Sequence, residues 1–204
     1  MSIKFVEYHN DKHLIYNRLR FVTLENQTDE CVYQNSRIDI QYLDVERLVP
    51  AQRYVLRQDL DRVKQLRHEV FDASDGGIDI LRLDGRLVIT FSDSDEPLDL
   101  LPPIVEVSKE HNMEQVLLVN DGMHRLYLAW LEWATPSVIV IKEASHPYYA
   151  YPIRGKSPWE RVQIVDSFPE GFLKRWPRMG NKEESRKLFR NFDSMFNTKH
   201  ARRR

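Results

Sequence analysis

A short, fully apolar run that leads directly into a glycine and a helix constrains this chain more than any other feature. The run spans 116–119, and its length and composition are typical of a strand buried on both faces of a sheet. Asn120-Asp121-Gly122-Met123-His124-Arg125 follows, and an apolar helical pattern covers 123–133. A strand, a glycine turn and a helix start gather backbone N–H groups and the positive end of a helix dipole at one point, which suits a bound phosphate.

The side chains of this junction also suit a phosphate. Gly122 allows close backbone approach, Arg125 can grip phosphate oxygens with its planar fork, and His124 can donate a hydrogen bond. Asp121 makes sense as the ligand of a Mg²⁺ ion that bridges it to the phosphates. The alternative is a helix that Asn120 or Asp121 merely caps.

We therefore predict Asp121 and His124 as catalytic residues, with Asp121 also the metal ligand. The predicted nucleotide-binding residues are Asn120, Gly122, Met123, His124, Arg125, Arg53 and Arg57. For Arg53 and Arg57, which precede a helix, plain surface charge is an equal alternative. We expect Arg125 to face the ligand and to contribute little to the helix's apolar stripe, unless it pairs with a carboxylate such as Glu106 or Glu132.

Composition excludes several classes of protein. The formal net charge is -1, so no global basic field favours DNA as a partner. The single cysteine, Cys31, forms no internal disulfide and has no neighbours at zinc-finger spacing. No apolar run approaches the roughly 20 residues that span a bilayer, and no signal peptide is evident. We expect a cytoplasmic protein that does not contact a membrane.

Periodicity and turn residues divide the chain into three zones. We predict an N-terminal extension with strand content over 1–36, a nucleotide-binding domain over 37–151, and a C-terminal elaboration over 152–204 that ends in a helix from about Lys182 to Phe196. The central zone contains predicted strands at 38–43, 103–107, 116–119 and 137–141, and predicted helices at 56–71 and 123–133. Asp84-Gly85 predicts a type I′ hairpin between strands 78–83 and 86–91, inside an insertion near 78–101. The fold class is α+β, a mixed sheet with packed helices.

The order of these elements resembles the ParB N-terminal domain, sulfiredoxin and the archaeal free-serine kinases. The matching segments, in order, are 38–43, Val49-Pro50-Ala51-Gln52, 56–71, 103–107, 116–119 and 121–125. The resemblance covers about half of the chain and implies the ParB/sulfiredoxin fold with ATP or CTP and Mg²⁺ as ligands. The kinase branch carries an Asp-Gly-His-His-Arg box, which Asp121, Gly122, His124 and Arg125 match and from which Met123 departs.

Other positions depart from each branch of this family. Gln52 stands where the kinase branch has a catalytic Glu, and an amide cannot act as a general base. Sulfiredoxin has a Cys in its phosphate box, where this chain has none, and the proline-broken third zone offers no helix-turn-helix of the ParB kind. If the protein is an enzyme, another carboxylate must serve as base, and the nearest in sequence are Glu46, Asp59 and Asp61.

Two functions remain open at this point. One is a Mg²⁺-dependent phosphotransferase (kinase) or nucleotide hydrolase. The other is a non-catalytic module that binds a nucleotide or a nucleic-acid phosphate and regulates a partner protein or DNA. The segment 78–101 exceeds what the core of the predicted domain needs, so we expect it to supply the surface for a protein partner.

Overall fold

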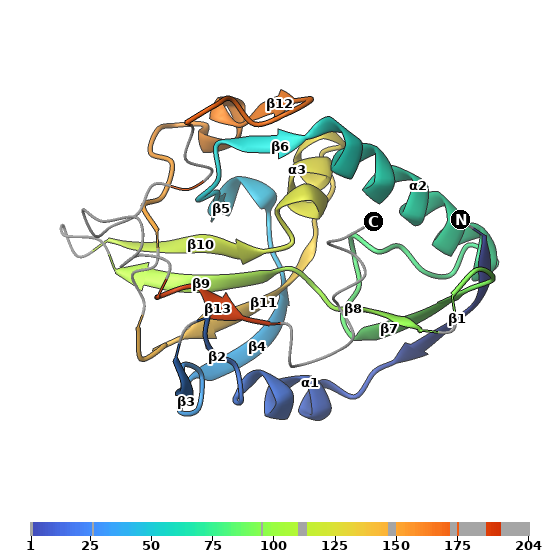
Figure 1. Ribbon diagram of the computed structural model, residues 1–204, viewed down its shortest axis with the longest axis horizontal. Coiled ribbons are helices and arrows are strands. Elements are labelled where there is room, and N and C mark those ends of the chain that lie inside the picture. Colours follow the sequence, from blue (N-terminus) through green and yellow to red (C-terminus); the bar gives the residue numbers. More distant parts are fainter. Residues whose placement is uncertain are drawn as a thin grey trace.

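A mixed sheet runs through the centre of the protein (Figure 1). The computed structural model describes residues 2–25, 27–94, 96–109, 114–146, 150–171, 175 and 187–192. Over these residues the strand order is β4 (Arg37–Tyr42), β11 (Ser137–Lys142), β9 (Ile104–Lys109), β10 (Gln115–Asp121) and β5 (Leu48–Val49). β11 runs parallel to β9 and β10 parallel to β5, whereas β4 with β11 and β9 with β10 are antiparallel. The prediction of an α+β fold with a mixed sheet is confirmed.

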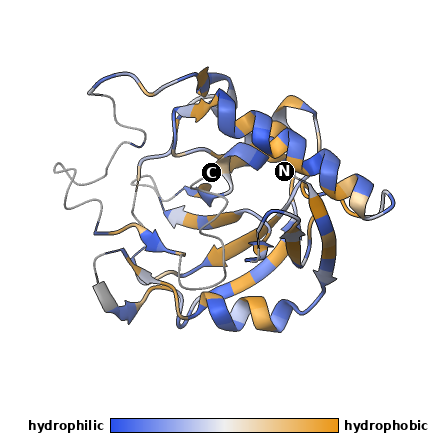
Figure 2. Cartoon of the chain, turned by 45° about the vertical axis from the view of Figure 1, so that its right-hand side comes forward, coloured by the Kyte–Doolittle hydropathy of each residue, from blue (hydrophilic) through white to orange (hydrophobic). Residues whose placement is uncertain are grey.

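Helices cover both faces of this sheet. α2 (Arg57–Ala73) and α3 (Met123–Leu131) lie over one face and α1 (Lys12–Leu19) lies over the other (Figure 1). Val105, Val119 and Val140 pack with α3 on the first face, while Ile139 and Ile141 pack with α1 on the second. Apolar colour accordingly concentrates on the central strands, and α2 is mostly hydrophilic (Figure 2). Strand burial on two faces explains why 116–119 reads as a continuous apolar run.

A second sheet joins the N-terminus to the middle of the chain. Its order is β1 (Ile3–His9), β7 (Arg86–Phe91) and β8 (Leu98–Leu100), and both neighbour pairs are antiparallel. The predicted hairpin around Asp84-Gly85 is therefore wrong, because 78–83 forms no strand and β7 pairs with β1 and β8 instead.

Packing explains the failure of the hairpin. Ile80, Leu81 and Leu83 are all buried in the cores rather than on alternate faces of a ladder. β1 takes the place of the expected partner strand, and its His9 carbonyl lies 2.5 Å from where a Cβ on Gly85 would stand. The segment 78–101 thus contributes several buried residues to the cores, and its role as a partner surface stays a prediction.

Short elements complete the described structure. They are β2 (Thr23–Leu24), β3 (Gln27–Cys31), η1 (Val45–Arg47), β6 (Tyr54–Leu56), η2 (Pro158–Arg161), β12 (Gln163–Val165) and β13 (Arg190–Asn191). β12 pairs with β6, and β13 pairs with β2. Among the described residues, no helix is long and apolar enough to cross a membrane.

The terminal zones match their predictions in part. β1, β2 and β3 confirm strand content in the N-terminal extension, although 12–19 forms the unexpected helix α1. Most of the predicted C-terminal helix over 182–196 lies outside the described residues, and its described part, 187–192, is a turn followed by β13 rather than a helix. Trp133, the last residue of the predicted helix 123–133, lies beyond the end of α3 and is 88 % exposed. The boundaries 1–36, 37–151 and 152–204 stay predictions.

A buried ion pair fixes the C-terminal segment to the central sheet. Glu106 of β9 accepts hydrogen bonds from Arg190 Nε (2.8 Å) and Nη2 (2.7 Å), and neither side chain is more than 1 % exposed. The same carboxylate accepts hydrogen bonds from the Tyr33 hydroxyl and the Asn120 amide. Burial, followed by the charge of Glu106, raises the pKa of Tyr33 well above its ordinary value, so its hydroxyl remains a donor.

Arg190→Met should lower the free energy of unfolding by about 3–5 kcal/mol, because it leaves Glu106 buried without its counter-charge. The double variant Glu106→Gln/Arg190→Met should recover most of this loss. Urea denaturation measures both. Arg37→Met is the control, since the Arg37–Glu143 pair lies on the surface and should contribute less than about 1 kcal/mol. An Arg190→Met variant as stable as wild type would contradict this account of the network.

Candidate functional site

The junction of β10 and α3 is built around a glycine that nothing larger can replace. Gly122 has φ +81°, in the left-handed region, and a Cβ there would lie 2.6 Å from Pro103 Cβ. β10 ends one residue earlier at Asp121, and α3 begins one residue later at Met123. Gly122 therefore brings the start of the helix into close contact with the turn before β9.

The start of α3 has no side-chain cap among the described residues. Its first internal bond runs from Leu126 N to Gly122 O (3.1 Å), so the three preceding N–H groups, at 123–125, receive no partner from the helix itself. The N-cap position itself is Gly122, one or two residues after Asp121 and Asn120, which the sequence offered as alternative caps. Backbone donors at an uncapped helix start are the arrangement that binds anions elsewhere.

Arg125 lies in this first turn but is buried, at 8 % exposure. Its Nη1 donates to the Leu101 carbonyl, and in the described part of the chain its guanidinium forms no ion pair with a carboxylate. Neither carboxylate considered from the sequence is its partner, because Glu106 binds Arg190 and Glu132 binds Arg67. The sequence did not indicate that Arg125 is buried, and its contact with a phosphate stays a prediction.

Burial leaves the charge of Arg125 incompletely balanced. Desolvation lowers its pKa from 12.5 to about 10, and the charge of Asp121 opposes that shift. At neutral pH the group stays charged, so the desolvation of its cation opposes folding. A bound anion would offset that cost.

His124 extends from the same turn towards the start of α2. Its Nε2 lies 3.8 Å from Oδ2 of Asp59, a residue in the first turn of α2, and the His124 side chain is 21 % exposed. Asp59 also receives Arg62 Nη1 at 3.3 Å. The first turns of two helices therefore bring an imidazole and a carboxylate to within 3.8 Å, which is longer than a hydrogen bond. Pairs used in general acid–base chemistry are often this long without substrate and shorten when it binds.

The remaining predicted residues do not all converge on this point. Asn120 is buried and directs its amide to Glu106 and Tyr33, and Met123 is 3 % exposed in the core under α3. Arg57 forms a surface ion pair with Asp166 (2.8 Å). Arg53 is exposed, and its carbonyl accepts from Gln163 N (2.8 Å).

Of the three carboxylates considered as a base, only Asp59 lies beside His124. Glu46 accepts a hydrogen bond from Trp130 Nε1 (2.8 Å). Asp61 lies 3.9 Å from Lys64 Nζ on the exposed side of α2. Periodicity could not separate these residues, because their distances from α3 depend on how η1 and α2 pack.

The donor set at the junction limits the kind of metal site that could form. Among the described residues, no group of three or more His, Cys, Asp or Glu side chains is arranged to hold a metal ion. Asp121 supplies a carboxylate at the end of β10. Mg²⁺ is often held by one or two carboxylates plus substrate phosphates and water, so Asp121 fits an ion that arrives with a nucleotide rather than a protein-only site.

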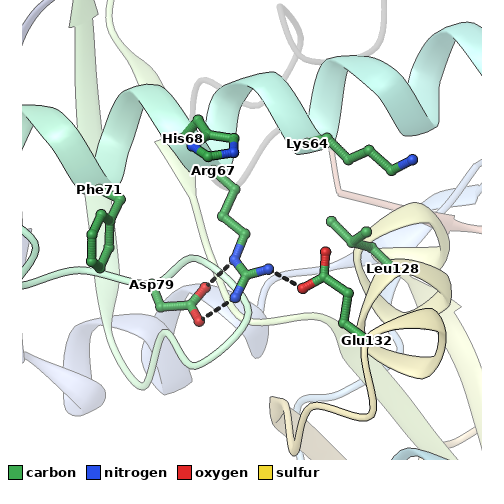
Figure 3. Close-up of a pocket in the computed structure, with 7 residues that line it drawn as sticks. All are labelled: Lys64, Arg67, His68, Phe71, Asp79, Leu128 and Glu132. Carbon is green, nitrogen blue, oxygen red and sulfur yellow. Dashed lines mark hydrogen bonds and ion pairs between the residues drawn. The ribbon is translucent and has the colours of Figure 1, made fainter.

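A cavity of about 400 Å³ lies elsewhere, between α2, α3 and the loop that carries Asp79 (Figure 3). Arg67 occupies its centre and donates to both oxygens of Asp79 (2.8 Å each) and to Glu132. The hydrogen bonds that Arg67 donates, chiefly those to Asp79, raise the pKa of Arg67. The Arg67 cation is balanced by two carboxylates, so we interpret these ion pairs as structural contacts between α2 and the end of α3. We therefore place the candidate site at the start of α3.

Comparison with known proteins identifies the family. The model of the ParB CE domain matches residues 14–163, about three quarters of the chain. This protein belongs to the ParB CE domain family. The match includes the β10–α3 junction, Asp59 and Glu106. It does not distinguish the kinase-like branch with the Asp-Gly-x-His-Arg box, which stays a prediction. No curated protein and no solved structure matches this ParB CE domain protein significantly.

Arg125→Met separates a ligand-binding arginine from a structural one. Methionine keeps the aliphatic stem and removes the desolvated charge, so the unliganded free energy of unfolding should rise or stay within about 1 kcal/mol of wild type. Urea denaturation without ligand measures this. Arg190→Met, the same substitution at a buried but ion-paired arginine, is the matched control and should be strongly destabilised. An equal loss in both variants would show that Arg125 is a structural tie.

Proposed function

We propose that this ParB CE domain protein binds a nucleoside triphosphate, ATP or CTP, through its phosphates at the first turn of α3. The observation that carries the proposal is the buried guanidinium of Arg125, which forms no ion pair among the described residues and lies in the first turn of a helix without a side-chain cap. A buried cation normally has an ion partner, and a phosphate would supply one. The N–H groups at 123–125 would bind further oxygens.

Mg²⁺ is part of this proposal. Asp121 would hold the ion together with the phosphate oxygens, and the bound ion would neutralise phosphate charge near that carboxylate. His124 would donate a hydrogen bond to the phosphates, with Asp59 orienting its ring. Arg57 is assigned no contact with the phosphates, because it is engaged with Asp166, whereas Arg53 remains a candidate contact.

Nucleotide binding should appear as a ligand-dependent rise in the melting midpoint of wild-type protein with Mg²⁺. A ligand at a hundredfold excess over its Kd stabilises the folded state by about 2.7 kcal/mol. Arg125→Met should abolish this rise, and Asp121→Asn should remove its dependence on Mg²⁺. Arg37→Met should behave as wild type. The proposal fails if neither ATP nor CTP shifts the wild-type midpoint under any Mg²⁺ concentration.

Two activities are compatible with such a site, and different observations favour them. The His124–Asp59 pair favours turnover, as a phosphotransferase or nucleotide hydrolase, because it supplies a group for proton transfer. Gln52 favours binding without turnover. It is 6 % exposed, and its amide is engaged with Arg175, so it offers no base at the position where the kinase-like branch has one.

Turnover is measured as release or transfer of labelled phosphate from ATP or CTP. If His124 and Asp59 act in proton transfer, His124→Ala and Asp59→Asn should each lower kcat by about 10²–10⁴, with nucleotide affinity changed only slightly for Asp59→Asn. Wild-type protein that binds nucleotide but releases and transfers no phosphate above the His124→Ala background would leave the non-catalytic module as the function.

A further inference from the structure

The carboxyl ends of two parallel strands meet beside the candidate site. Leu48 and Val49 of β5 pair in parallel with Leu117 and Leu118 of β10. Past this point the chain leaves β5 towards β6 and leaves β10 towards α3. Ligands of open sheets bind outside the carboxyl ends of strands, where neighbouring connections diverge.

Arg175 contacts both departing connections. Its Nη2 donates to the backbone carbonyl of Asn120 at 2.9 Å. The Gln52 amide is oriented with its oxygen towards Arg175, since the opposite orientation would oppose donor to donor. That oxygen accepts from Nη2 (2.8 Å) and Nε (3.3 Å) of Arg175, and the two backbones also form an antiparallel bridge.

These contacts hold the last part of β10 from two directions. The Asn120 side chain is bound on one side by Glu106 and Tyr33, while Arg175 binds its backbone carbonyl. The register of β10 against β9 shifts between Val119 and Asp121, so the ladder alone does not fix this stretch. Gly122 is only two residues further on, and the direction in which α3 leaves the sheet depends on where Asn120 lies.

We propose that Arg175 is a positioning residue for the phosphate site, acting through Asn120 and Gln52 to set the place of Gly122 and the first-turn N–H groups of α3. The inference rests on the proposed function. Donors aimed at a phosphate lose affinity when they are displaced by fractions of an ångström, so a tie at the preceding residue affects binding without touching the ligand.

The test compares Arg175→Met, Arg175→Lys, Gln52→Leu and the double variant Gln52→Leu/Arg175→Met. Calorimetric titration with MgATP and MgCTP gives the Kd of the folded protein, and thermal melting without ligand gives its stability. Arg175→Met should weaken binding of the better nucleotide about tenfold or more, at an unliganded midpoint close to wild type. Lysine should restore part of the affinity. The double variant should bind less weakly than the two single effects combined predict, because both residues act through one contact.

The outcomes separate this inference from the function it rests on. Wild-type protein without measurable nucleotide affinity overturns the proposed function. Tight binding by wild type and by Arg175→Met alike overturns the positioning role alone. A fall in the unliganded midpoint of Arg175→Met, with Kd per folded molecule unchanged, makes Arg175 structural and also overturns the inference. Arg37→Met, at a distant surface ion pair, is the matched control and should match wild type in both measurements.

Discussion

The carboxylate of Glu106 is the interaction on which the arrangement of this ParB CE domain protein depends. It stands in the middle of the central sheet at no measurable exposure and accepts hydrogen bonds from Tyr33, Asn120 and Arg190. These partners come from the N-terminal segment, the end of β10 and the C-terminal segment. A buried carboxylate is tolerated only when its charge and lone pairs are satisfied, so the three segments must dock together for the sheet to be stable.

Arg125 and Arg190, both buried, show what is different about the start of α3. Arg190 forms a bidentate ion pair with the Glu106 carboxylate. Arg125 instead donates to the Leu101 carbonyl and interacts with Asp121 through charge, without a hydrogen bond to it. The same fold thus satisfies one cation and leaves the other under-compensated, within the residues that the structure describes. Strained or incompletely satisfied groups are retained where function requires them, and a phosphate is the anion that the neighbouring helix start also favours.

The sequence predicted the parts of the fold that local pattern determines. The strand at 116–119, Gly122 and the helix after it were readable, because apolar burial and a required glycine leave local traces. The burial of Arg125 and the approach of Asp59 to His124 were not, since both depend on how loops and helices pack. The hairpin at Asp84-Gly85 failed because β1, about 80 residues earlier, supplies the partner strand. The contact between Arg175 and Asn120 could not be predicted from local pattern, because the two residues are 55 positions apart in the sequence.

The central claim is that the first turn of α3 binds phosphate, and residue-specific NMR tests it most directly. Amide resonances of Met123, His124 and Arg125, together with the Nε resonance of Arg125, would be followed while MgATP or MgCTP is titrated into labelled protein. The account predicts saturable shifts that are largest at these four positions and that share one Kd. Saturable binding with its largest shifts elsewhere, for example around Arg67 and Asp79, would contradict it.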